Sequence, residues 1–312
     1  MGKIIALCNQ KGGVGKTTSA INISAYFALM KKKTLLIDAD PQANATSGMG
    51  LDKKSAQKGT YELLMGLAEA QQVIVAGSIK RLNVIQSSVS LAGAEIELVG
   101  MPSREFKLRD MLATLKQEYD YIFIDCPPSL GLLTLNCLVA ADSVIIPLQC
   151  EYYALEGLSQ LMDTIGLVKQ SLNNNLCLEG VVLTMADFRT RLTGEVIKEV
   201  QSFFKDKVYK TIIPRSIRLS EAPGFGKPIM LYDKLSVGSQ RYKLLAKEIL
   251  SKQVPLDNIS NPASSSVESR LENENIGNET RVHQVIGQSE ISQNNTDLNK
   301  EDEGKVEDVP HV

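Results

Sequence analysis

Short apolar runs alternate with longer helical patterns along the first 250 residues of the chain. The apolar runs are continuous in Val, Ile and Leu rather than alternating with polar residues, which is typical of strands buried on both faces of a parallel sheet. They predict strands at Lys3–Cys8, Thr34–Asp38, Leu82–Gln86, Tyr121–Asp125, Ser143–Leu148, Gly180–Thr184 and Thr211–Pro214. Helical stretches between them include Thr17–Met30, Arg104–Glu118, Leu155–Leu172, Thr193–Phe204 and Ser236–Leu250.

This order of strands and helices predicts an α/β fold, in which a single, mostly parallel, twisted sheet is flanked by helices on both faces. The sequence shows no internal repeat. One α/β domain can hold about 250 residues, so a second folded domain is not needed. We therefore expect residues 1–252 to form one domain.

The alternating pattern stops near residue 252. Residues 253–312 contain no Phe, Tyr, Met or Cys and are rich in Ser, Asn, Gln and Glu. Such a segment cannot bury enough apolar surface to offset its chain entropy, so we predict a disordered C-terminal tail. The tail holds 12 acidic and 4 basic residues, so the formal net charge of −2 conceals a body with 30 basic and 24 acidic residues.

Composition excludes several classes of protein. The chain is 43% hydrophobic and 22% charged, which is ordinary for a globular protein. It has no apolar run long enough for a transmembrane helix, and its apolar start ends too early for a signal peptide, so we expect a cytoplasmic protein. The five cysteines form no C-x-x-C pair, which argues against zinc and redox motifs. Both histidines lie in the tail, which excludes a serine–histidine triad in the body.

The first predicted strand is followed by a glycine-rich segment, Lys11-Gly12-Gly13-Val14-Gly15-Lys16-Thr17-Thr18. Its glycines let backbone N–H groups turn toward an anion, and the N-terminus of the next helix adds positive potential. In a P-loop of this kind we expect Lys16 to reach the β- and γ-phosphates and the Thr17 hydroxyl to bind Mg²⁺. The common formula has a glycine where Gln10 stands, and here Lys11 precedes the glycine pair. We predict nucleotide binding, and an ordinary glycine turn is the alternative.

Two apolar strands end in aspartate. Asp38 ends the second predicted strand and is followed by Asp40, while Asp125 ends a later one. Ligands of open α/β sheets bind beyond the carboxyl ends of the strands, where such a carboxylate can hold Mg²⁺ beside the phosphates. An aspartate that only caps a turn is the alternative for each position taken singly.

These residues resemble the ParA/Soj chromosome-partitioning ATPases of the deviant Walker A (ParA–MinD) superfamily, which have a P-loop NTPase-like fold. The matching segments are Lys11–Thr18, Asp38–Asn44, Asp125–Ser129 and Ile213–Pro223, and they occur in the expected order and spacing. The first strand starts at Lys3, without a preceding helix-turn-helix domain. In this respect the chain is similar to the short, Soj-like type.

The resemblance implies that two subunits sandwich two ATP molecules and hydrolyse them weakly. It makes Lys11, which crosses to the phosphates of the partner, a catalytic residue with Lys16 and with Asp40, which orients the attacking water. Asp38 and Asp125 would support Mg²⁺ together with Thr17. Pro214 and Ser216 would contact the adenine.

The resemblance also implies partners. Arg189 and Arg218 match positions that bind DNA in Soj-like proteins, and many further basic residues lie in the same half of the body. No base-reading motif accompanies them, which favours double-stranded DNA bound without sequence preference, with a solvated basic face as the alternative. The ATP-bound homodimer would bind DNA and release it on hydrolysis stimulated by a ParB-type protein. We accordingly expect a nucleoid-associated protein that segregates a chromosome or a plasmid.

Three relatives of that superfamily offer competing functions. A MinD-like division-site ATPase needs a basic amphipathic helix at its C-terminus, whereas Glu307–Val312 is acidic and contains Pro310, so we expect no stable membrane anchor. An iron protein like that of nitrogenase needs exposed cluster-binding cysteines, whereas Cys126 directly follows a strand end. A tyrosine-kinase relative would carry tyrosines in its tail, and this tail has none.

Overall fold

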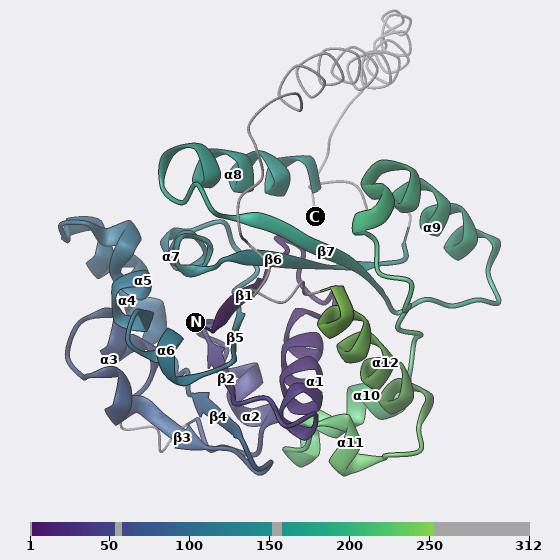
Figure 1. Ribbon diagram of the computed structural model, residues 1–312, viewed down its shortest axis with the longest axis horizontal. Helices are drawn as coiled ribbons and strands as arrows, with labels where there is room; N and C mark the ends of the chain where they lie inside the picture. Colours follow the sequence, from purple (N-terminus) through teal and green to yellow (C-terminus); the bar gives the residue numbers. More distant parts are fainter. Residues whose placement is uncertain (1, 54–57, 152–157, 253–312) are drawn as a thin grey trace, which may run out of the picture. The chain divides into compact units, whose positions relative to one another are not determined.

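Seven strands lie side by side in one sheet within the described residues of the computed structural model, which are 2–53, 58–151 and 158–252 (Figure 1). The strands are β1 (Lys3–Leu7), β2 (Thr34–Asp38), β3 (Ile74–Ala76), β4 (Leu82–Ile85), β5 (Tyr121–Asp125), β6 (Ser143–Gln149) and β7 (Cys177–Thr184). Their order across the sheet is β3-β4-β2-β5-β1-β6-β7. Every neighbouring pair is parallel except β3 and β4, so the predicted α/β fold is confirmed. The tail predicted for residues 253–312 lies outside the described residues.

Helices cover both faces of this sheet (Figure 1). They are α1 (Lys16–Leu29), α2 (Asn44–Gly48), α3 (Thr60–Leu64), α4 (Leu91–Glu97), α5 (Lys107–Leu112), α6 (Leu115–Glu118), α7 (Leu132–Ala140), α8 (Leu158–Ser171), α9 (Arg191–Phe204), α10 (Ile217–Glu221), α11 (Ile229–Tyr232) and α12 (Val237–Lys252). One face packs against α3 to α9, and the other packs against α1, α2 and α10 to α12.

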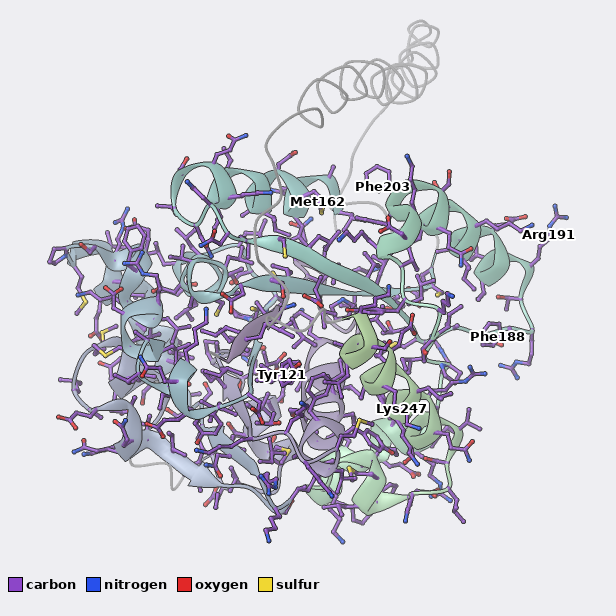
Figure 2. The ribbon with its side chains drawn as sticks, viewed as in Figure 1. Tyr121, Met162, Phe188, Arg191, Phe203 and Lys247 are labelled. Carbon is purple, nitrogen blue, oxygen red and sulfur yellow. The ribbon has the colours of Figure 1, made fainter. Side chains whose placement is uncertain are left out.

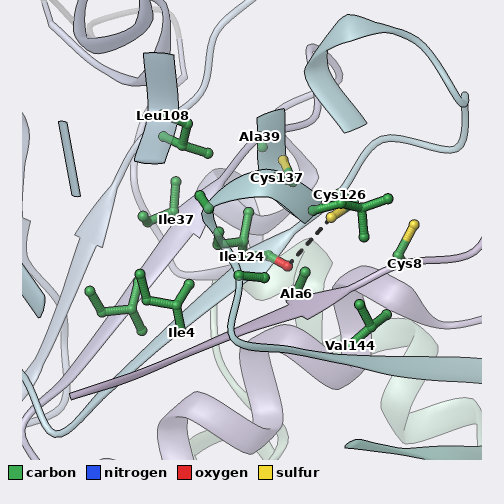
Figure 3. Packing of buried hydrophobic residues seen from close by; sticks show 14 of the residues in the cluster. Ile4, Ala6, Cys8, Ile37, Ala39, Leu108, Ile124, Cys126, Cys137 and Val144 are labelled. Carbon is green, nitrogen blue, oxygen red and sulfur yellow. Dashed lines mark hydrogen bonds between the residues drawn. The ribbon is translucent and has the colours of Figure 1, made fainter. Parts of the chain in front are cut away.

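The continuous apolar strands arise because each strand contributes to two cores. Successive side chains of a strand point to opposite faces, so Ile4 and Ala6 of β1 enter one core while Ile5 and Leu7 enter the other. Figure 3 shows the first core, where Cys126 lies among buried apolar side chains. A thiol buried in this way is not at an exposed face, which is where a cluster shared between subunits would need its cysteines.

Two predicted elements differ from the structure. The strand predicted at Thr211–Pro214 is wrong: this segment forms only an isolated bridge to Ala186. Its start is diverted because the backbone N–H groups of Lys210 and Thr211 donate to the Glu248 carboxylate at 2.7 and 2.9 Å. Its end cannot continue a ladder because proline has no N–H.

The helix predicted at Arg104–Glu118 is broken into a 3₁₀ turn (Arg104–Phe106), α5 and α6. In a continuous helix, the N–H of Leu108 would donate to the carbonyl of Arg104. Here the side chain of Asn136, from α7, forms hydrogen bonds with both of these groups. It donates to the carbonyl of Arg104 at 2.9 Å and accepts from the N–H of Leu108 at 3.1 Å. A long-range side chain therefore replaces a helical hydrogen bond.

Among the described residues, no helix combines the length and the apolar character that crossing a bilayer requires.

Candidate functional site

The glycine-rich segment joins the carboxyl end of β1 to the start of α1. Gly13 and Gly15 have φ angles of 76° and 89°, a left-handed backbone that favours glycine. This turn starts α1 at Lys16, so the free N–H groups of the helix lie at the sheet edge. The Thr184 hydroxyl, at the end of β7, donates to the carbonyl of Val14 at 2.8 Å and fixes the turn to the sheet. A backbone built in this way can cradle an anion.

Lys16 points back into the turn rather than into solvent. Its side chain is buried, and Nζ donates to the carbonyl of Lys11 at 3.1 Å. Burial lowers the pKa of Lys16, and the negative charge of Asp125 opposes that shift. An ammonium group that has lost most of its water gains strongly from a phosphate, because the phosphate restores the missing electrostatic stabilisation.

Asp38 and Asp125 face each other at the ends of neighbouring strands, in direct register across β2 and β5. Asp125 is fully buried, and neither of its carboxylate oxygens has a hydrogen-bond partner among the described residues. Burial first, and then Asp38, raise the pKa of Asp125 well above its usual range, while the nearby Thr17 hydroxyl acts in the opposite direction. An orphaned carboxylate beside a hydroxyl is a set of hard oxygen donors, which fits Mg²⁺.

Asp38 is also fully buried, but its oxygens are already engaged. Oδ2 accepts from the N–H and the hydroxyl of Thr46, both at 2.7 Å, and Oδ1 accepts from the N–H of Asp40 at 3.2 Å. Burial raises the pKa of Asp38 to about 6, against the effect of these hydrogen bonds. Asp38 therefore anchors the segment that follows β2. It would act on a cation by binding one of the cation's waters or by its charge beside Asp125, and not as a direct ligand.

Asp40 lies on that anchored segment. Its Oδ1 accepts from the N–H of Gln42 at 2.9 Å, and its carbonyl accepts from the Ser87 hydroxyl at 2.7 Å. Only 7% of Asp40 is exposed. The backbone thus holds this carboxylate in place near the edge formed by the turn of residues 12–15, Lys16 and Asp125, which is called the phosphate edge below.

Lys11 behaves differently from Lys16, because its side chain is 40% exposed. Its Nζ lies 3.8 Å from Oε2 of Glu151, and the other oxygen of Glu151 lies 3.6 Å from Nη2 of Arg215. The backbone of Lys11 is therefore part of the turn while its side chain lies outside it, and Lys11 shares the carboxylate of Glu151 with Arg215.

Pro214 and Ser216 reach the same edge of the sheet. Pro214 bridges to Ala186, two residues after the threonine that holds the P-loop. Ser216 stands directly before α10. The structure thus brings the segment predicted for adenine beside the segment predicted for phosphate.

Arg189 and Arg218 lie on the surface, in the connection between β7 and α9 and in α10. The side chains are 87% and 56% exposed, and both form ion pairs with carboxylates. Neither arginine is among the contacts of the phosphate edge described above.

Sequence reasoning missed residues that support the site: Thr46, Ser87, Glu151, Thr184 and also Asn9, whose Oδ1 accepts from the N–H of Lys11 at 3.0 Å. All of them except Thr46 stand at or just after the carboxyl end of a strand. The rule that found Asp38 and Asp125 could have found these four. Thr46, within α2, carried no such signal.

Comparison with known proteins agrees with this geometry. Residues 2–178 match the family described as an AAA domain. The chain is 57% identical over 249 residues to the sporulation initiation inhibitor protein Soj of Bacillus subtilis (strain 168), covering 80% of this chain and 98% of that protein. It is 53% identical over 255 residues to the chromosome partitioning protein ParA of Myxococcus xanthus, covering 82% and 90%.

Solved structures show the same architecture. The crystal structure of cobyrinic acid a,c-diamide synthase from Mycobacterium smegmatis, with bound ATP analog and magnesium, has a TM-score of 0.71 at 35% identity, covering 80% of this chain and 95% of that chain. A plasmid partition protein from Borrelia burgdorferi has a TM-score of 0.65 at 26% identity, covering 81% and 99%. Together with the Soj and ParA relatives, these matches show that the chain belongs to the ParA/Soj family of P-loop ATPases.

Proposed function

We propose that this protein is an Mg²⁺-dependent ATPase that partitions a chromosome or a plasmid. The observation that carries the proposal is the phosphate edge, where a glycine turn meets a buried lysine and a buried carboxylate that has no hydrogen-bond partner within residues 2–53, 58–151 and 158–252. The names of the Soj and ParA relatives support the partitioning role, and the solved relative from Mycobacterium smegmatis supports ATP and magnesium as ligands.

In this proposal the chain's own residues divide the work on the nucleotide. The N–H groups of residues 12–18 and the Lys16 ammonium bind and orient the phosphates. Thr17 and Asp125 would hold Mg²⁺, with Asp38 anchoring the neighbouring backbone. The ion, when bound, would neutralise negative charge on the phosphates. Asp40 would orient the attacking water, since the backbone already holds its carboxylate near this edge.

Hydrolysis is expected to involve two subunits. The Lys11 side chain is 40% exposed, and its Nζ lies 3.8 Å from Glu151 rather than inside its own P-loop. A second subunit facing the phosphate edge would offer this lysine a nucleotide phosphate, which binds an ammonium more strongly than a carboxylate 3.8 Å away. We therefore propose an ATP-sandwich homodimer in which Lys11 stabilises charge on the transferring phosphoryl group.

The ATP-bound dimer is proposed to bind double-stranded DNA without sequence preference through Arg189 and Arg218. Dimerisation doubles the basic surface, and affinity for DNA rises steeply with the number of phosphates contacted. A ParB-type partner would stimulate hydrolysis and so release the DNA. Such a protein would be found on the nucleoid.

The test is nucleotide-dependent DNA binding, measured by fluorescence anisotropy on two unrelated duplexes with ATP, with ADP and without nucleotide. Wild-type protein and Asp40→Ala are compared, with Asp110→Ala, an exposed carboxylate of α5, as the control. Asp40→Ala should hydrolyse ATP slowly and remain dimeric and DNA-bound in ATP. Equal affinity in all nucleotide states, or preference for one duplex, would contradict the proposal. Binding to anionic vesicles instead of DNA would favour a MinD-like function.

A further inference from the structure

Both arginines proposed to bind DNA are already held by carboxylates of the same chain. Nε and Nη2 of Arg189 donate to the two oxygens of Asp187 at 2.8 and 2.6 Å. Nη1 of Arg218 donates to Glu221 at 3.0 Å, and its Nε lies 3.5 Å from Asp233. A polyanion that approaches these arginines therefore meets negative charge beside each of them.

The carboxylates are fixed by the fold and not only by the arginines. Asp187 also accepts from the backbone N–H of Arg189 at 3.1 Å. Asp233 accepts from the N–H groups of Leu235 and Ser236 at 3.2 and 3.0 Å, directly before α12 begins. Glu221 accepts from the Tyr232 hydroxyl at 2.9 Å. These side chains would stay in place if the arginines turned toward DNA.

The first of these pairs lies where DNA would have access to it. Phe188 and Arg191, which flank Arg189 in the sequence, lie at the edge of the molecule near the start of α9 (Figure 2). The side chain of Arg189 is 87% exposed, whereas that of Asp187 is only 27% exposed. Arg189 lowers the pKa of Asp187 to about 2, so the carboxylate is ionised at any pH at which DNA is duplex.

We propose that Asp187, Glu221 and Asp233 set the DNA affinity of this protein by competing with DNA phosphates for Arg189 and Arg218. The inference rests on the proposed DNA-binding function. A guanidinium shared with a carboxylate carries little net charge, so it displaces fewer counterions from DNA and contributes less to affinity. Internal pairing thus keeps binding weak enough for rapid release when the second subunit is lost.

The opposite role for these carboxylates would be to hold the arginines in position for phosphate. The two roles differ in sign, because loss of a competitor tightens DNA binding while loss of a positioning group weakens it. Substitution of aspartate by asparagine distinguishes the two roles. Asparagine has the shape of aspartate and can still accept the backbone hydrogen bonds, but it has no charge.

The experiment compares Asp187→Asn and Asp233→Asn with the wild-type full-length chain, by anisotropy on duplex DNA with ATP at several salt concentrations. Each variant should bind about threefold to tenfold more tightly near 0.1 M salt, with a steeper dependence on salt. Asp110→Asn is the matched control, because Asp110 pairs with two nitrogens of Arg109 at 2.9 and 2.8 Å on α5. It should not change DNA affinity.

Two independent positions keep the inference testable if one variant folds poorly, as judged by its melting temperature. Unchanged or weaker binding by a folded variant would overturn the inference while the proposed function stands. A wild-type protein that binds no DNA in any nucleotide state would overturn the proposed function and, with it, this inference.

Discussion

Charge is handled in opposite ways at the phosphate edge and around the two surface arginines. At the edge, no described residue gives the buried Asp125 carboxylate a hydrogen-bond partner, and the buried Lys16 ammonium donates to a backbone carbonyl. At the surface, Arg189 and Arg218 are exposed and paired. A buried charge without a partner destabilises the folded protein until a ligand of opposite charge binds. An exposed ion pair changes the folding free energy little, and it discriminates little between ligands. Under the proposed function, the edge would hold its ligand tightly and the surface would release its ligand easily.

The substitution expected to have the largest effect on this contrast is Lys16→Ala. Because Lys16 is the buried cation of the P-loop, its loss should reduce ATP affinity at least about 100-fold, the scale of a lost buried charged contact. Isothermal titration calorimetry measures this directly, with Lys58→Ala as a surface control. Near-wild-type affinity would show that the turn does not bind phosphate through this lysine.

Charge reversal at the surface should have a smaller effect. Arg189→Glu or Arg218→Glu should weaken DNA binding by about tenfold to 100-fold and equally for unrelated duplexes, because each change replaces attraction to a phosphate by repulsion. ATP binding and ATP-dependent dimerisation should persist, as judged by calorimetry and size-exclusion chromatography. Arg109→Glu, on α5, provides the matched control. A loss restricted to one DNA sequence would contradict phosphate contact.

The smallest expected effect concerns the stability of the nucleotide-free protein. Burial raises the pKa of Asp125, so the native state binds a proton that the unfolded state releases above about pH 4. Stability should therefore fall as the pH rises from about 4 toward the raised pKa. Asp125→Asn removes this penalty and should raise the melting temperature at neutral pH by a few degrees.

Thermal unfolding from about pH 5 to pH 8 tests this prediction, and the variant should show a weaker dependence on pH than the wild type. Asp110→Asn should leave the curve unchanged, because that carboxylate is exposed. A lower melting temperature for Asp125→Asn would mean that the buried carboxylate is satisfied in solution, which would remove the contrast between the two regions.

The parallel core of the fold could be predicted from sequence because its signal is local. Strands such as Thr34–Asp38 and Tyr121–Asp125 are apolar on both faces, and their bounds agree with the structure. The broken helix could not be predicted, since Asn136 reaches it from about 30 positions away. Likewise, the diversion of Thr211 by Glu248 depends on a contact that only the folded chain creates.

The same distinction applies to the candidate site. Lys16, Asp38 and Asp125 could be identified because a P-loop and strand-end aspartates follow the local pattern. The sequence could not show that Asp38 is hydrogen-bonded while the oxygens of Asp125 have no hydrogen-bond partner among the described residues. That difference arises because Thr46 contacts Asp38 in the folded chain. The ion pairs of Arg189 and Arg218 could not be predicted from the sequence either, because the conformation of the surface turns determines which side chains meet.

The two edges of the sheet have a consequence for aggregation. One edge is β3, which is only 3 residues long. Along the other edge, the N–H groups of Tyr209 and Ile213 donate to carbonyls of β7 at Val181 and Leu183, both at 2.9 Å. Short or covered edges resist strand addition by other molecules. Pairing of sheets between copies of this protein is therefore disfavoured, and contacts between copies would be made by side-chain surfaces.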